Sequence, residues 1–201
     1  MTRSLAIWAA LGVACILPAI LAGTSPQLAW RGPVYILAGF AGVIAMALLL
    51  VQPLLIGGYL PGSTPRSSRR WHRWIGASLL ALVVIHVGAL WWTSPPDVVD
   101  ALLFRSPTPF SDWGVIAMWA VFATGLLAVF RKRLRLRPSV WTAIHLMLAV
   151  VVILGSVVHA MLIEGTMETI SKTALCAFVI VAAVKLIADR KPWSLSKRSN
   201  A

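Results

Sequence analysis

Six long apolar blocks, separated by short polar gaps, dominate the sequence. They run from about Leu5 to Gly23, Val34 to Tyr59, Trp71 to Trp92, Trp113 to Phe130, Val140 to Ile163 and Ile170 to Ala188. An α-helix of about 20 apolar residues crosses the hydrocarbon layer of a membrane. Continuous apolar runs exclude a membrane β-barrel, whose strands alternate apolar and polar residues. We therefore predict an all-α integral membrane protein, a six-helix bundle.

Three positions affect where these spans begin or bend. The first block follows a single Arg3 and could pass for a signal peptide, but we favour a retained helix. Pro53 is expected to kink the second span. The third helix is expected to start before its apolar block, with Thr64 as N-cap and Pro65 in the first turn, so that His72 lies two turns inside it.

Composition supports one membrane domain. The chain has 201 residues, of which 59% are hydrophobic and only 12% charged, which is too apolar for a soluble domain. Six spans use most of this length, so we expect a single transmembrane domain over residues 1–201. The net charge of +12 lies in the gaps between blocks, not on a soluble basic face. Membrane lipid is therefore an expected partner, and nucleic acid is not.

The basic residues also predict an orientation. They gather at residues 66–73, at residues 131–137 and in a short tail over residues 189–201, whereas most acidic residues lie in the other gaps. Loops rich in Lys and Arg remain in the cytoplasm. Both termini and the basic tail are thus expected to be cytoplasmic, with the protein in a bacterial inner membrane.

The four histidines lie on two spans at the same spacing. His72 and His86 are 14 residues apart on the third span, and His145 and His159 are 14 apart on the fifth. At about 100° and 1.5 Å per residue, two such positions face within roughly 40° of each other and lie roughly 21 Å apart. The two spans run in the same direction. We therefore predict that His72 meets His145 near the cytoplasm and that His86 meets His159 nearer the outside.

Two stacked histidine pairs fit two flat macrocycles with one axial ligand on each side, which predicts two b-type haems. A single histidine in a span is more often a proton-relay residue or a polar packing contact. A zinc site needs three or four ligands that converge on one point, whereas these pairs are separated by most of the bilayer. A cofactor-free membrane scaffold or transporter remains open as an alternative.

Four neighbours of the histidines are further candidates. Gly76 and Gly155 each lie one helical turn from a histidine on the same face, where a missing side chain would let a porphyrin approach the backbone. Ordinary small-residue helix packing is the alternative. Arg69 and Arg73 flank His72 and could pair with haem propionates or with anionic lipid headgroups.

Two segments resemble the ferric reductase-like transmembrane domain. They are Arg69-Arg70-Trp71-His72-Arg73-Trp74-Ile75-Gly76 through His86, and Trp141-Thr142-Ala143-Ile144-His145 through His159. That domain forms the membrane part of ferric reductases and NADPH oxidases, and its relatives include the haem-binding membrane subunit of the bacterial methionine sulfoxide reductase system. The resemblance covers roughly residues 34–188. It implies an inner haem on His72 and His145, an outer haem on His86 and His159, and electrons that move outward.

The chain departs from the enzymes of that family in one respect. It has no glycine-rich dinucleotide fingerprint, so we expect no flavin or nicotinamide site within it. The resemblance thus implies a membrane oxidoreductase component, the membrane part of a ferric or other metal reductase, with a separate electron donor and an outer-side acceptor. The donor could be a flavoprotein on the basic inner face or a quinol. In the quinol-fed alternative, the chain would pass electrons to a periplasmic reductase.

Overall fold

The computed structural model describes residues 2–190, and all regular secondary structure over that range is helical. Its elements are α1 (Thr2–Gly23), the 3-10 helix η1 (Pro26–Trp30), α2 (Pro33–Gly57), α3 (Pro65–Thr93), α4 (Pro95–Leu102), α5 (Pro109–Val129), α6 (Arg131–Leu134), α7 (Pro138–Leu162) and α8 (Thr169–Arg190). Within the described range, six of these helices are long and apolar enough to cross a membrane: α1, α2, α3, α5, α7 and α8. The predicted all-α bundle of six spans is confirmed.

Proline sets the start of most of these helices. Five helices (α2, α3, α4, α5 and α7) begin with proline, whose fixed φ and missing N–H suit the first helical position. At α3, the Thr64 side chain accepts a hydrogen bond from the Ser67 N–H, and the Ser67 hydroxyl accepts one from the Thr64 N–H. This capping box confirms the early start predicted for the third span. Pro53 lies inside α2 without ending it.

Three short elements were not predicted. The segment around Pro95 and Pro96 lies in a gap between the predicted spans, where it begins α4, and η1 and α6 also lie in such gaps. Each is too short to carry a clear apolar period, so the sequence pattern gave no signal for it. The predicted basic tail, residues 189–201, falls mostly outside the described residues.

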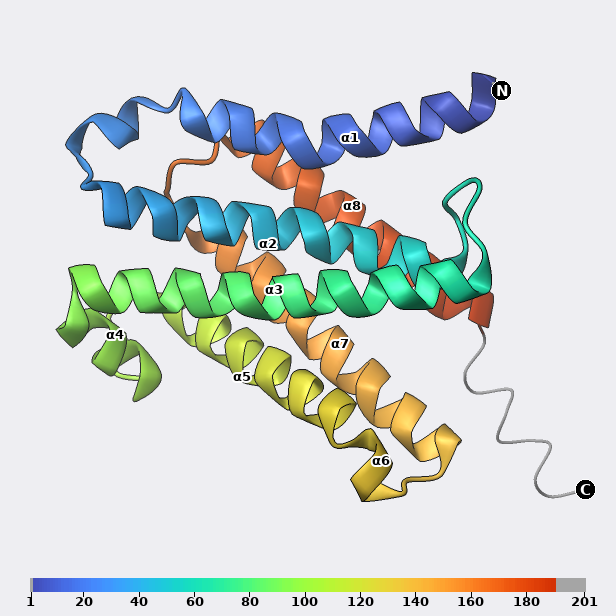
Figure 1. The fold of residues 1–201 in the computed structure, drawn as a ribbon. Helices are drawn as coiled ribbons and strands as arrows, with labels where there is room; N and C mark the ends of the chain where they lie inside the picture. Colours follow the sequence, from blue (N-terminus) through green and yellow to red (C-terminus); the bar gives the residue numbers. More distant parts are fainter. Residues whose placement is uncertain (1, 191–201) are drawn as a thin grey trace, which may run out of the picture.

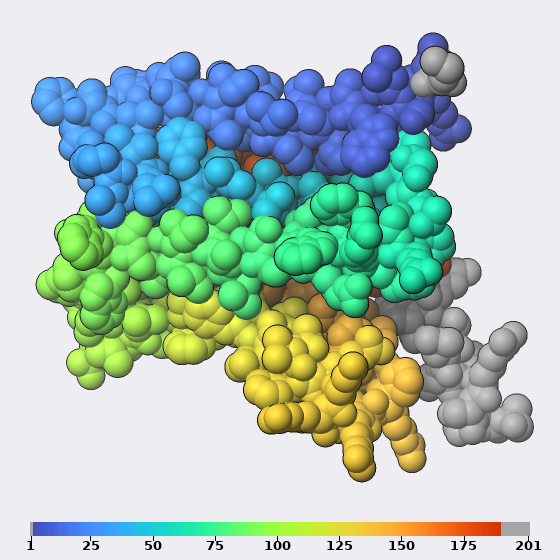
Figure 2. Space-filling view, in the orientation of Figure 1, coloured from blue at the N-terminus to red at the C-terminus, as the bar shows by residue number. Residues whose placement is uncertain are grey.

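The helices associate as two closely packed pairs. α2 packs along α3, and α5 packs along α7, while α8 joins the bundle against α2. In Figure 1, α3 runs across the front of the molecule and α5 and α7 lie together on one side of it. Figure 2 shows α1 along one edge, over α2, so α1 is the most peripheral span on this face.

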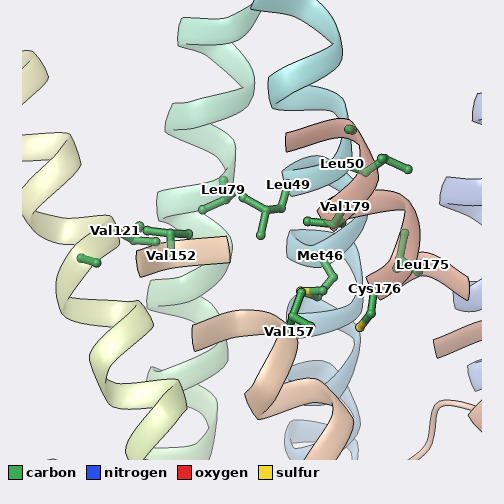
Figure 3. Close-up of a cluster of buried hydrophobic side chains, with 12 residues drawn as sticks. Met46, Leu49, Leu50, Leu79, Val121, Val152, Val157, Leu175, Cys176 and Val179 are labelled. Carbon is green, nitrogen blue, oxygen red and sulfur yellow. The ribbon is translucent and has the colours of Figure 1, made fainter. Parts of the chain in front are cut away.

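The centre of the bundle is an aliphatic cluster contributed by α2, α3, α5, α7 and α8. Its members include Leu49, Leu79, Val121, Val152 and Val179 (Figure 3). Leu79 is seven residues from both histidines of α3, and Val152 is seven from both histidines of α7. Because seven residues make almost two turns, these two side chains lie on the histidine faces, midway between the two histidine levels.

The two ends of the bundle differ in charge. The turn between α2 and α3 and the basic helix α6 lie at one end, and α4, with Asp97 and Asp100, lies at the other (Figure 1). The segments that were predicted to be cytoplasmic thus lie together at one end, and the acidic helix α4 lies at the other. We call the basic end the inner end and the other the outer end.

Candidate functional site

The four histidines form two pairs between α3 and α7. The ring centroids of His72 and His145 are 6.1 Å apart, and those of His86 and His159 are 6.4 Å apart. The planes within each pair are twisted by 68° and 86°. The predicted pairing is confirmed, with the first pair towards the inner end and the second towards the outer end.

The ring separations suit a metal ion held between two imidazoles. Two such rings on opposite sides of one metal, with metal–nitrogen bonds of about 2 Å, have centroids roughly 6 Å apart. In residues 2–190, no group of three or more His, Cys, Asp or Glu side chains could hold a metal ion. Among the described residues, each level therefore offers two imidazole donors, and such a pair is a donor set that a protein can supply to a haem iron.

The histidine pairs lie between the two closely packed helix pairs. The tightest backbone packing joins α2 to α3 and α5 to α7, so the histidine rings connect the two helix pairs. α3 and α7 bury a smaller share of their spans than α2, α5 or α8. These two helices thus have more surface outside the interior of the bundle than α2, α5 or α8.

The outer pair has a defined tautomer. The Nδ1 atom of His86 lies 2.7 Å from the carbonyl oxygen of Ala38, and Nδ1 of His159 lies 2.7 Å from that of Phe110. A carbonyl oxygen only accepts, so Nδ1 carries the hydrogen in both rings. The lone pair is then on Nε2, and the ring is oriented as in metal-ligating histidines whose other nitrogen donates to a carbonyl.

The inner pair is held differently. The Nδ1 atoms of His72 and His145 are buried and have no hydrogen-bond partner among the described residues. The ring of Trp141 stacks on that of His145, with centroids 5.0 Å apart and planes at 9°, and the Arg131 guanidinium lies 4.4 Å above the Trp141 ring. Gln52 of α2 donates to the His72 carbonyl at 3.4 Å. Aromatic stacking, rather than a carbonyl, therefore orients the inner ring on α7.

The predicted glycines face neighbouring helices. A Cβ added at Gly155 would lie 3.0 Å from both the Ala117 Cβ and the Trp113 carbonyl oxygen, so this glycine permits close packing of α7 on α5. A Cβ at Gly76 would lie 3.2 Å from Gln52 Nε2. These contacts favour the helix-packing alternative, and a role beside a porphyrin stays a prediction for both.

The two predicted arginines lie near the inner pair. Arg69 and Arg73 are exposed on the first turns of α3, close in sequence to His72. Arg69 is three residues before His72 and shares its side of the helix, whereas Arg73 is turned by about 100°. Pairing with propionates or with lipid headgroups stays a prediction for each.

Besides Ala38 and Phe110, whose carbonyls accept from the outer histidines, four residues that contact the histidines or their backbone were not predicted from the sequence. They are Gly42, Gly114, Trp141 and Gln52. Trp141 had a signal, since it lies four residues before His145 on the same helix face. The other three are on α2 and α5, and only the pairing of helices brings them to the histidines.

Comparison with known proteins gives one match. The family model described as ferric reductase like transmembrane component matches residues 38–156, more than half of the chain. The matched segment contains His72, His86 and His145, and His159 follows it by three residues. No curated protein and no solved structure matches. Together with the six apolar helices, the family match shows an integral, multi-pass membrane protein.

Proposed function

Since the chain belongs to the ferric reductase-like transmembrane component family, we propose that it is a di-haem electron-transfer protein. The inner haem is held by His72 and His145, and the outer haem by His86 and His159. Electrons pass from the cytoplasmic side outward, and the chain is the membrane part of a metal reductase in a bacterial inner membrane. Membership of the family supports a membrane oxidoreductase component; the haem count and the direction are the proposal.

One observation carries this proposal: two histidine pairs at two levels of one bundle, each with the ring separation of axial ligands. Histidines in a membrane span are costly and rare unless they have a function. Bound between two imidazoles, haem iron supplies a one-electron couple that no side chain of this protein offers.

The protein's own residues would separate and insulate the two levels. Leu79 and Val152 lie between the levels, within a buried cluster of aliphatic side chains. Such a layer excludes water and mobile ions from the middle of the bundle. The two levels are roughly 21 Å apart along each helix, measured between the Cα atoms of its two histidines.

The inner end suits an acidic electron donor. Three basic residues of α6 (Arg131, Lys132 and Arg133) are exposed there, as are Arg69 and Arg73 of α3. A cationic surface raises the association rate of a negatively charged partner. We therefore propose that the electron donor is a flavoprotein that docks on this basic end.

A membrane quinol is the second candidate donor, and one observation favours it. A shallow apolar hollow of about 410 Å³, largely open to the outside of the protein, lies between α5, α6 and α7 and is lined by Leu126, Phe130 and Ile144 among others. Ile144 precedes the inner ligand His145 in the chain. An apolar pocket at the side of a bundle suits a lipid-soluble molecule. In this second candidate function, the chain passes quinol electrons to a periplasmic reductase.

Haem quantitation in the purified full-length protein tests the proposal. We expect two b-type haems per chain, loss of one haem in His72→Ala or His145→Ala, and loss of the other in His86→Ala or His159→Ala. Met147→Ala is the matched control, because Met147 is 70% exposed and two residues from His145. Haem-supplemented protein without a Soret band would refute the proposal and favour a cofactor-free scaffold or transporter.

The donor is tested on the same preparation. Rapid and complete reduction by a quinol analogue favours the quinol-fed function. Reduction only by a flavoprotein, with a rate that falls as salt screens the basic end, favours the reductase.

A further inference from the structure

Each outer histidine is held at two points by the helix that packs beside it. The first point is the carbonyl that accepts from Nδ1: Ala38 on α2 for His86, and Phe110 on α5 for His159. The second point is a glycine four residues after that carbonyl. Positions four residues apart lie on one face of a helix, so both features meet the same ring.

The two glycines leave the room that the rings occupy. A Cβ added at Gly114 would lie 2.6 Å from His159 Nδ1 and 2.8 Å from its Cε1. A Cβ added at Gly42 would lie 3.3 Å from His86 Nδ1. The contact at Gly114 is impossible unless the His159 ring shifts. The contact at Gly42 requires the His86 ring to move by a few tenths of an ångström. Gly114 is thus the stricter position.

This arrangement occurs twice, once in each closely packed helix pair. The carbonyl precedes its histidine by 48 residues in the α2–α3 pair and by 49 in the α5–α7 pair. The inner rings differ, since their Nδ1 atoms meet no described hydrogen-bond partner. The carbonyl and glycine together, which we call the ring clamp, are therefore a property of the outer pair.

We propose that Gly42 and Gly114 are positioning residues of the outer haem, an inference that rests on the proposed function. The clamp holds Nδ1 of each ring against a carbonyl, which leaves Nε2 of His86 and of His159 as the nitrogen that can bind iron. A hydrogen bond from Nδ1–H to a carbonyl makes Nε2 a stronger donor. A stronger donor stabilises the ferric state, so the intact clamp lowers the reduction potential of the outer haem.

Three alanine variants of the full-length protein test this inference. Gly88→Ala is the matched control, because Gly88 lies in α3, two residues after His86, and nothing lies within 4 Å of its added Cβ. Alanine is a better helix former than glycine, so any gain in helix stability is shared by all three variants. The readouts are haem per chain, the low-spin signals of each haem in electron paramagnetic resonance, and a redox titration.

In Gly114→Ala we expect the haem content to fall from two to one per chain, with the inner haem's signal unchanged. Gly42→Ala should keep both haems, with an altered outer signal and a raised outer potential. Gly88→Ala should match wild type. If Gly114→Ala misfolds and loses both haems, the Gly42→Ala variant decides. A change in its outer-haem signal without a change in its inner-haem signal supports the clamp. A wild-type outer-haem signal overturns it.

The failures are distinguishable. Wild-type protein without haem ends the proposed function. Wild-type protein with two haems, together with Gly42→Ala and Gly114→Ala variants that both match Gly88→Ala, overturns the ring clamp alone. Gly114→Ala in the His159→Ala background should leave the remaining inner haem unaltered, and a change there would also count against the clamp.

Discussion

At the residue scale, the ring of His145 depends on one aromatic neighbour. Trp141 stacks on it and is itself covered by Arg131, while no described group hydrogen-bonds to His145 Nδ1. Offset stacked rings and a cation over a ring face are each modestly favourable. The stack is thus the feature that can keep this imidazole directed towards α3.

We predict that Trp141→Ala weakens retention of the inner haem on the order of 10-fold, the lower range for loss of a group that orients a metal ligand. Trp141→Phe keeps a stacked ring and should retain most of the wild-type affinity. The measurement is haem transfer to apomyoglobin, followed at the inner haem's absorbance. Trp74→Ala is the control, because Trp74 is 65% exposed and also near the inner end. Equal loss in Trp141→Ala and Trp74→Ala would contradict the role of the stack.

Glu168 holds the start of α8 through its charge. Its carboxylate accepts hydrogen bonds from the backbone N–H groups of Ile170 and Ser171, each at 2.7 Å. These bonds, that from Ser171 first, hold the pKa of Glu168 below its ordinary value of 4.5. A depressed carboxyl pKa stabilises the fold above the ordinary value, and this stabilisation is lost as pH falls through the folded pKa.

Glu168→Gln should therefore melt at a lower temperature than wild type near neutral pH, by a few degrees at most because the site is exposed. The difference should shrink as pH falls below about 4.5, where the wild-type carboxyl also gains its proton. Thermal unfolding in detergent across this pH range measures it. Glu164→Gln, which removes a carboxylate from the same loop, is the control. A difference that is constant with pH would show that the charge is not responsible.

At the element scale, α7 approaches α5 through Gly155. A Cβ added at Gly155 would lie 3.0 Å from the Trp113 carbonyl oxygen and 3.0 Å from the Ala117 Cβ, so only a hydrogen atom fits there. His159 lies one turn further along α7, so the separation of these helices also sets the place of that ligand. Small residues at helix contacts serve such close approach within membranes.

We expect Gly155→Ala to be mildly destabilising and Gly155→Leu to separate α5 from α7, with loss of the outer haem before the inner one. Overpacking of a close contact costs about 1–3 kcal/mol. Haem content and melting temperature, measured together, test this. Gly12→Leu is the control, since nothing lies within 4 Å of an added Cβ there. If Gly155→Leu binds the outer haem as wild type does, the contact is not the one that places His159.

Features set by neighbouring residues or by the helical period can be predicted from the sequence, whereas most contacts between residues far apart in the chain cannot. The spans follow from apolar length, and the start of α3 follows from Thr64 and Pro65, because both signals are local. The pairing of His72 with His145 follows from helical period and parallel direction. Gly42 and Gly114 could not be predicted, since each lies more than 40 residues from its histidine and only helix packing brings the two together.

At the scale of the whole molecule, the bundle consists of two similar halves. α2 supports α3, and α5 supports α7, with a carbonyl and a glycine in each supporting helix directed at the outer histidine. The sequence shows this repeat only in the histidine spacing. The two halves face each other through the histidine rings. Each proposed haem site would therefore draw one ligand from each half and form only when both halves are docked.

The proposed direction of electron flow depends on which end faces the cytoplasm. The basic residues in the first turns of α3 and in α6 lie at the end that carries His72 and His145. Basic loops remain on the cytoplasmic side during insertion. We therefore predict that Ser139→Cys, at the start of α7, faces the cytoplasm and that Arg105→Cys, between α4 and α5, faces outward. Both positions are exposed.

A membrane-impermeant maleimide applied to spheroplasts tests this prediction. Cys15 and Cys176 lie within spans, and Cys176 is buried, so the charged reagent should not reach them. Arg105→Cys should react in intact spheroplasts, and Ser139→Cys only after lysis. The reverse pattern would place His86 and His159 beside the cytoplasm. The clamped pair would then be the entry site for cytoplasmic electrons, and the basic end could no longer dock a cytoplasmic donor.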